Sequence, residues 1–161
     1  MAKFKQVLLV LLTVFACVGC DQVSKAAASQ HLAHQPALSF AGDAVRLQYA
    51  ENRGAFLSLG DQLPERERAI VFTGVVGVCL AGFLAYLLCA SRLSPRSLLA
   101  CSLICGGGIG NLVDRIARSG YVVDFVNCGI GRLRTGIFNF ADLSITVGVV
   151  MLLIASFTRR R

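Results

Sequence analysis

Charged residues are scarce in this chain of 161 residues, and their scarcity excludes an ordinary soluble domain. Only 16 % of the residues are Asp, Glu, Lys or Arg, against about 25 % in a typical soluble protein. Apolar residues make up 55 % of the chain, and the mean hydropathy is +0.67. We therefore expect lipid to surround much of a single domain spanning residues 1–161.

Four apolar runs approach or exceed the length that crosses a bilayer as a helix, roughly 20 residues with 17 near the lower limit. They occupy residues 4–20, 69–90, 97–113 and 140–157. The runs predict an α-helical polytopic membrane protein with four transmembrane helices. The connecting segments, residues 21–68 and 114–139, are expected to form a small extracytoplasmic β-platform and a loop.

Acidic residues are missing from the N-terminal segment, from the link between the second and third runs, and from the tail. These segments carry seven basic residues: Lys3, Lys5, Arg92, Arg96, Arg159, Arg160 and Arg161. Lys and Arg collect on the cytoplasmic side of a membrane, so both termini are expected in the cytoplasm and both larger connections outside it. The net charge of +7 is thus a topology signal, and no nucleic-acid partner is expected.

No pattern of cysteine and histidine points to a metal. The chain has seven cysteines, and Cys79, Cys89, Cys101 and Cys105 lie inside apolar runs, where cysteine packs as a small hydrophobe. His31 and His34 are assigned to a polar loop without a nearby third ligand. We expect neither a metal nor a cofactor.

The first twenty residues have two interpretations. Lys3 and Lys5, the apolar stretch and Cys17-Val18-Gly19-Cys20 resemble a secretory or lipoprotein signal peptide. A lipid-attachment site favours leucine where this chain has Cys17, and three further spans follow. A retained first helix is therefore the preferred interpretation.

The connections contain strand and turn signals. Residues 44–59 indicate a strand, a turn at 51–54 and a second strand through 55–57. Residues 61–68 predict a surface turn that leads into a helix. In the second connection, residues 121–126 read as a strand, and three glycines predict a flexible loop after it: Gly129, Gly131 and Gly136.

Small residues recur at four-residue spacing in the third run, at Ser102, Gly106 and Gly110. This spacing is typical of membrane helices that pack closely. A dinucleotide-binding GxGxxG motif is excluded, since Asn111 replaces its last glycine and no strand precedes it.

Polar side chains collect at the ends of the third and fourth runs. Asn111 and Arg115 share one helix face, and Asn139 and Asp142 share another. Taken singly, each could face headgroup water, and the helix macrodipole would stabilise Asp142 near a helix start. Together they predict a polar site at one membrane depth.

Asp124 stands among apolar strand residues, where a carboxylate pays desolvation unless it faces a polar site. If Asp124 approaches Asp142, the pair would hold one proton between them. The ionised member would activate a water and the protonated member would polarise a carbonyl. This chemistry is peptide hydrolysis without a covalent intermediate. Ser144 and the cysteines fit a nucleophilic mechanism poorly, because none has a base in its sequence neighbourhood.

Five segments resemble the sequence blocks of signal peptidase II, the lipoprotein signal peptidase family. Their order and spacing match over nearly the whole chain, as do the four spans. The segments are Asp21–Lys25, Asn52–Phe56, Gly107–Arg115, Val123–Phe125 and Phe138–Asp142.

The resemblance implies an aspartic endopeptidase of the bacterial inner membrane with its active site at the periplasmic face. Such an enzyme removes the signal peptide from prolipoproteins just before a diacylglyceryl-modified cysteine. It would contact membrane lipids, bind globomycin-type inhibitors and act as a monomer. Asp124 and Asp142 are the implied catalytic pair. The residues implied to hold the peptide backbone or shape the pocket are Asn52, Asn111, Arg115, Asn139 and Asp21.

The chain departs from the family pattern in the loop before the last block, and Asp114 is assigned separately from the catalytic pair. It has no tryptophan, whereas many members carry one in the loop before the last block. That loop here reads Gly131-Arg132-Leu133-Arg134, so the resemblance does not tell how the loop covers the substrate. Asp114 adjoins Arg115 and is expected to form a structural ion pair.

Two other functions fit the composition. The chain could be a small transporter or channel that uses Asp142 and Arg115, or a non-catalytic membrane scaffold. A transporter places ionisable groups near the bilayer midplane and often shows repeated halves. The centres of these runs are uncharged and no repeat is found, which counts against transport.

Overall fold

The computed structural model describes residues 2–54, 62–90 and 93–158. Its helices are α1 (Lys3–Leu32), α2 (Glu65–Arg68), α3 (Val76–Cys89), α4 (Pro95–Ala117) and α5 (Phe140–Thr158), and the π-helical turn η2 (Ala69–Val75) joins α2 to α3. Its strands are β1 (Leu38–Phe40), β2 (Val45–Asn52), β3 (Val122–Ile130) and β4 (Leu133–Arg134). The strands form one antiparallel sheet in the order β1-β2-β3-β4.

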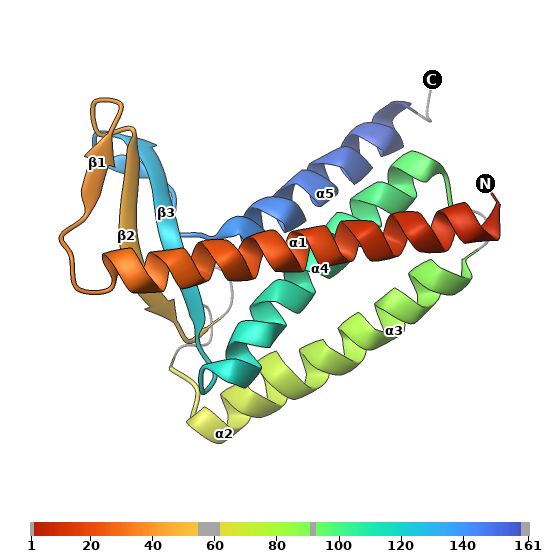
Figure 1. Cartoon of the computed structure of the whole chain (residues 1–161), viewed down its shortest axis with the longest axis horizontal. Helices are drawn as coiled ribbons and strands as arrows, with labels where there is room; N and C mark the ends of the chain where they lie inside the picture. Colours follow the sequence, from red (N-terminus) through yellow and green to blue (C-terminus); the bar gives the residue numbers. More distant parts are fainter. Residues whose placement is uncertain (1, 55–61, 91–92, 159–161) are drawn as a thin grey trace.

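Four helical segments are long and apolar enough to cross a bilayer: Lys3–Leu32, Glu65–Cys89, Pro95–Ala117 and Phe140–Thr158. The small sheet lies at one end of the helices, and the start of α1 and the end of α5 lie at the other (Figure 1). The predicted class, a four-helix membrane protein with a small β-platform, is confirmed.

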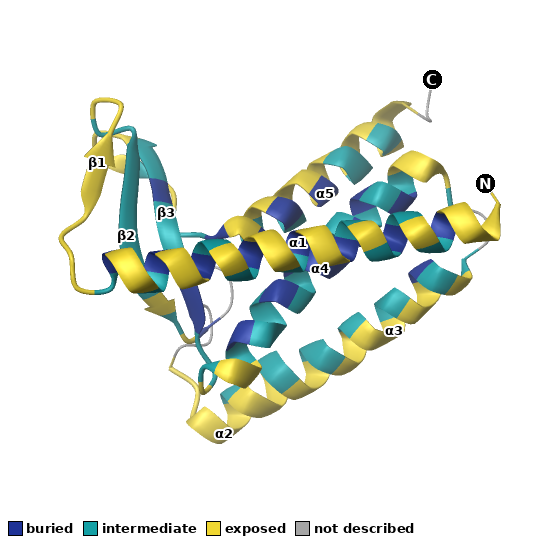
Figure 2. Cartoon of the chain, in the orientation of Figure 1, coloured by how far each residue is buried: buried dark blue, intermediate teal, exposed yellow. Residues whose placement is uncertain are grey.

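Small residues let the other helices approach α4 closely, as the sequence predicts. A Cβ on Gly106 would lie 2.8 Å from the Cβ of Cys17 in α1, and one on Gly107 would collide with the carbonyl of Ala141 in α5. Figure 2 shows buried residues on α4 and along α1, whereas α3 is almost entirely intermediate or exposed. Within α3 only Leu87 is buried, so this helix presents its apolar side chains to lipid.

Helix α1 is longer than its apolar run. The apolar pattern predicts a connection from residue 21 onward, but the helix continues to Leu32, and His31 belongs to its last turn rather than to a loop. Hydropathy detects the part that matches a bilayer, whereas the rest is held by its packing. Along the extension Asp21, Lys25 and Ala28 are buried at helical spacing.

The flexible loop predicted after residue 126 is instead a hairpin. Strand β3 runs to Ile130 and pairs with β4, and Gly131 turns the chain with φ +57°. Gly129 is a strand residue whose missing Cβ leaves space for the backbone of Arg134, 2.6 Å from the Cβ position. The strand predicted at 55–57 lies outside the described residues.

The sheet register puts Asp124 and an apolar tip on the same face. Alternate residues of a strand share a face, as do residues directly opposite each other on antiparallel strands. Asp124 therefore shares its face with Ile130, which pairs with Leu133. Ile130 and Leu133 are 84 % and 85 % exposed, so the face that bears Asp124 ends in an exposed apolar hairpin.

Candidate active site

Asp124 lies in β3 with only 3 % of its surface exposed. Two amides hold its carboxylate: Asn52 Nδ2 donates to Oδ2 at 3.1 Å, and Asn139 Nδ2 donates to Oδ1 at 2.6 Å. Burial, followed by the negative charge of Asp142, raises the pKa of Asp124 to about 6. The amides oppose this shift without cancelling it. Asp124 is thus a carboxyl that exchanges its proton close to neutral pH.

Asp142 lies in the first turn of α5 and is only partly buried. Asn111 Nδ2 in α4 donates to its Oδ1 at 2.9 Å, and the backbone N of Asn139 donates to its Oδ2 at 3.2 Å. A helix start carries unsatisfied N–H groups and a partial positive charge. The carboxylate of Asp142 is thus held by one side-chain amide from α4 and one backbone N–H at the start of α5.

The two aspartates line one cavity of about 300 Å³ between the sheet and the ends of α4 and α5. Asn52, Asn111 and Arg115, which the resemblance implies as residues that hold the peptide or shape the pocket, line the same cavity. Apolar side chains, among them Phe138 and Leu143, complete its wall. Two carboxylates and an apolar surface thus meet in one space.

Arg115 contributes a positive charge to the cavity wall. Its Nη2 donates to the carbonyl of Gly54 at 2.7 Å, and its guanidinium lies 5.7 Å from the centre of the Phe72 ring. Its buried Nε has no hydrogen-bond partner among the described residues. The backbone N of Gly54 in turn donates to Asn52 Oδ1 at 3.0 Å, so Arg115 and Asn52 hold the same turn.

Asn139 and Asp21 lie behind the cavity rather than in its wall. Asn139 is 1 % exposed and its Nδ2 also donates to Asn111 Oδ1 at 3.1 Å. Asp21 is fully buried and accepts a hydrogen bond from the backbone N of Ala141 at 2.9 Å. These contacts orient the start of α5. Of the two roles that the resemblance implies for Asp21, the position of this residue fits shaping the pocket rather than holding the peptide.

Asp114 forms a structural ion pair, as predicted, but its cations are Lys25 at 3.2 Å and Arg118 at 3.4 Å rather than the adjacent Arg115. Neighbours in a helix point in different directions, whereas residues four apart share a face. Asp114 Oδ2 also accepts from the backbone N of Val123 at 2.9 Å. Asp114 therefore fixes β3, the strand of Asp124, against α4.

Sequence reasoning assigned no role to Lys25, which is fully buried in the extension of α1. Its Nζ contacts Asp21 at 2.8 Å and Asn111 Oδ1 at 2.9 Å. The signal was present, since Asp21 and Lys25 are four residues apart and would share a helix face. This spacing indicates an ion pair only in a helix, and the apolar pattern places residues 21–25 in a connection.

The described residues contain no group of three or more His, Cys, Asp or Glu that could hold a metal ion. Cys17 and Cys20 have CxxC spacing, although no metal site is predicted from the cysteines. Both lie in α1 as free thiols, Cys17 buried and Cys20 exposed. Their spacing in a continuous helix does not create a metal site.

Chemically, the arrangement supplies two carboxylates in unlike surroundings and several donors in a partly apolar cavity. Asp124 is buried with a raised pKa, whereas Asp142 lies at a helix start. In many hydrolases a carboxyl with a raised pKa acts as the acid, and a second carboxylate beside it acts as the base. The site can thus hold a proton on one carboxyl and activate water with the other.

Comparison with known proteins gives a consistent result. A family profile described as "Signal peptidase (SPase) II" matches residues 13–158. Lipoprotein signal peptidases of Syntrophus aciditrophicus and Caldicellulosiruptor bescii are similar to the chain, with 32 % identity over 151 residues and 37 % over 132 residues. The alignments cover 93 % and 82 % of this chain, and 92 % and 79 % of the relatives. A solved structure described as a bacterial membrane enzyme is 25 % identical with a TM-score of 0.77, covering 92 % of this chain and 87 % of that one.

Proposed function

The chain belongs to the signal peptidase II family, and from this membership we propose that it is an aspartic endopeptidase of the bacterial inner membrane. As a multi-pass membrane protease it cleaves signal peptides from prolipoproteins. The cleaved bond precedes a diacylglyceryl-modified cysteine, and Asp124 and Asp142 act on a water molecule. Membership of a peptidase family favours this function over the transporter and scaffold alternatives.

The observation that carries the proposal is the meeting of two unlike carboxylates in one cavity. Asp124, with a pKa near 6, holds the shared proton and donates a hydrogen bond to the scissile carbonyl. Asp142, at the helix start, removes a proton from the attacking water. The tetrahedral intermediate then collapses as the amine leaves with a proton. The pair needs no metal and no covalent intermediate.

Polar donors around the pair hold the substrate backbone. Arg115 and Asn52 lie on the cavity wall and are assigned to peptide carbonyls, while Asn111 keeps Asp142 in place. Asn139 supports both carboxylates from behind, and Asp21 shapes the start of α5. The apolar part of the wall accommodates the hydrophobic end of the signal peptide next to the lipid-modified cysteine.

The orientation follows from the basic residues. At the ends of the helices opposite the sheet, α1 begins with Lys3 and Lys5, and α5 ends just before the basic tail. Both termini are therefore assigned to the cytoplasm. The sheet and the cavity then face the periplasm, where a prolipoprotein emerges. The enzyme acts as a monomer, is a single domain over residues 1–161, and binds globomycin-type inhibitors in the same cavity.

The decisive test is cleavage of a lipidated prolipoprotein by purified protein in lipid. Asp124→Asn and Asp142→Asn are expected to lower kcat by at least about 100-fold, the usual contribution of an acid or base. Asp43→Asn is the matched control, because Asp43 is 39 % exposed in its side chain and pairs with Arg46. Near-normal turnover in either cavity variant, with Asp43→Asn also normal, would refute the aspartate pair.

A further inference from the structure

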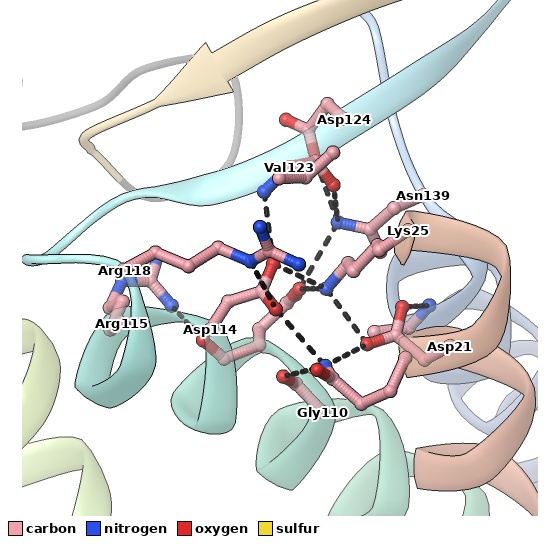
Figure 3. Close-up of polar contacts among 12 residues, drawn as sticks. Asp21, Lys25, Gly110, Asp114, Arg115, Arg118, Val123, Asp124 and Asn139 are labelled. Carbon is pink, nitrogen blue, oxygen red and sulfur yellow. Dashed lines mark hydrogen bonds and ion pairs between the residues drawn. The ribbon is translucent and has the colours of Figure 1, made fainter. Parts of the chain in front are cut away.

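Lys25 carries a positive charge into the fully buried space behind the cavity (Figure 3). Two carboxylates flank its Nζ, Asp21 at 2.8 Å and Asp114 at 3.2 Å. Arg118, 25 % exposed in its side chain, adds a second cation to Asp114. Two negative and two positive groups thus balance, which a buried cluster requires.

Charge balance does not explain the third contact of Lys25. An ammonium group has three N–H donors and no acceptor. Two donors meet the carboxylates, and the third meets the neutral side-chain oxygen of Asn111 at 2.9 Å. Asn111 is the residue that donates to Asp142, so the buried cation touches the active site through one amide.

The contact decides which way the Asn111 amide points. Its Oδ1 accepts from Lys25 and from Asn139 Nδ2 at 3.1 Å, which uses both lone pairs. Its Nδ2 donates to Asp142 Oδ1 at 2.9 Å. A flipped amide would put NH₂ against the ammonium group and a carbonyl oxygen against the carboxylate. Both contacts would then be repulsive.

We propose that Lys25 is a positioning residue of the active site: it fixes the Asn111 amide in the orientation that donates a hydrogen bond to Asp142. The inference rests on the proposed role of Asp142. It differs from a purely structural role, in which Lys25 would only neutralise Asp21 and Asp114. The positioning role predicts that the effect of a Lys25 substitution on kcat depends on Asn111, whereas the structural role predicts that it does not.

A double-mutant cycle between Lys25→Met and Asn111→Ala separates the roles. All four proteins carry Asp21→Asn, so that removal of the ammonium leaves no excess buried carboxylate. If Lys25 acts through Asn111, Lys25→Met lowers kcat by about tenfold or more when Asn111 is present, as misplacement of a catalytic group does. It changes kcat by less than about twofold when Asn111 is already alanine. KM stays within about twofold, since uniform substrate binding is not altered.

If Lys25→Met and Asn111→Ala each lower kcat, and the double variant shows the product of the two factors, the two residues act independently and the proposal is overturned. If the Lys25→Met protein does not fold in detergent, Lys25→Arg, which keeps the charge, replaces it in the same cycle under the same criterion. Arg118→Met is the matched control: it removes the other cation from Asp114 without a contact to Asn111 and is expected to keep kcat within about twofold.

A second readout does not depend on activity. The chain has four asparagines, Asn52, Asn111, Asn127 and Asn139, so a protein labelled with ¹⁵N-asparagine gives few side-chain amide signals. Lys25→Met is expected to shift the Asn111 signal, and Arg118→Met to leave it unchanged. An unchanged Asn111 signal in Lys25→Met refutes the positioning role. Normal turnover of Asp142→Asn refutes the proposed function instead.

Discussion

Asn139 and Asp142 cap the start of α5 reciprocally. The backbone N of Asp142 donates to Asn139 Oδ1 at 2.9 Å, and the backbone N of Asn139 donates to Asp142 Oδ2 at 3.2 Å. This is a capping box with Asn at the N-cap and Asp three residues later. The Nδ2 of the same Asn139 reaches Asp124 at 2.6 Å. The helix cap and the relative placement of the two carboxylates therefore depend on one side chain.

Serine and alanine at position 139 separate these two tasks. Serine can still accept from the backbone N of Asp142, so Asn139→Ser should unfold within a few degrees of the parent protein, while Asn139→Ala should lose about 1 kcal/mol more. Both lose the donor to Asp124 and should lower kcat by at least about tenfold. Thermal unfolding and initial rates check this; wild-type turnover in Asn139→Ser would show that the amide is not needed.

Asp124 should titrate with a pKa of about 6, and its pKa should fall in Asp142→Asn because the neighbouring negative charge is removed. The folded protein binds the proton of Asp124 more tightly than the unfolded chain does. The favourable contribution of protonation is therefore lost as pH rises from 3.8, the ordinary value, to about 6. Carboxyl ¹³C NMR measures the pKa, and Asp124→Asn should remove this part of the pH dependence of unfolding. A pKa unaffected by Asp142→Asn would contradict the coupling.

Asp114→Asn should lower stability more than specific activity. The carboxylate is fully buried, pairs with Lys25 and accepts from the backbone of Val123. Weakening such contacts costs about 1–3 kcal/mol. Chemical unfolding and turnover per folded molecule measure the two effects. A large loss of turnover with unchanged unfolding would assign Asp114 to the chemistry.

Gly148→Ala should weaken the contact of α5 with α4. The new Cβ would lie 2.5 Å from the carbonyl oxygen of Ala100 and 2.7 Å from Cγ1 of Ile104, and such overpacking costs about 1–3 kcal/mol. Gly82→Ala in α3 is the matched control, because no packing neighbour among the described residues lies within 4 Å of its Cβ position. It should be neutral or stabilising, since alanine favours a helix. Equal melting temperatures of the two variants would contradict the close packing.

Leu133→Trp should report a membrane-facing hairpin. Leu133 shares a sheet face with Asp124 and is 85 % exposed, and tryptophan prefers the bilayer interface. Because the native chain has no tryptophan, the reporter has no background. Its fluorescence in proteoliposomes should be quenched by lipids with brominated acyl chains, and that of Gln35→Trp should not. Equal quenching of both would contradict the prediction that the β3–β4 hairpin faces the membrane.

Several expectations failed for a common physical reason. Hydropathy identified the four spans, but it could not show that α1 continues to Leu32, because a polar helix is stabilised by partners on other segments. The same limit concealed Lys25, because its contacts with Asn111 and Asp114 in α4 join segments that are far apart in the sequence. The glycines predict a flexible loop after residue 126, whereas Gly129 lies in β3, where its lack of a Cβ lets the backbone of β4 approach closely.

The sequence by itself determined the membrane class, the four helices, the close packing around α4 and the residues worth testing as a catalytic pair. Periodicity, hydropathy and residue type are local properties, and these features follow from them. Only the tertiary structure decided that Asp124 and Asp142 line one cavity, that Asp21 and Asn139 support it from behind, and that Lys25 reaches Asn111. These relationships depend on how a strand and three helices pack together, because hydrogen bonds between distant segments form only when packing brings their atoms within about 3 Å.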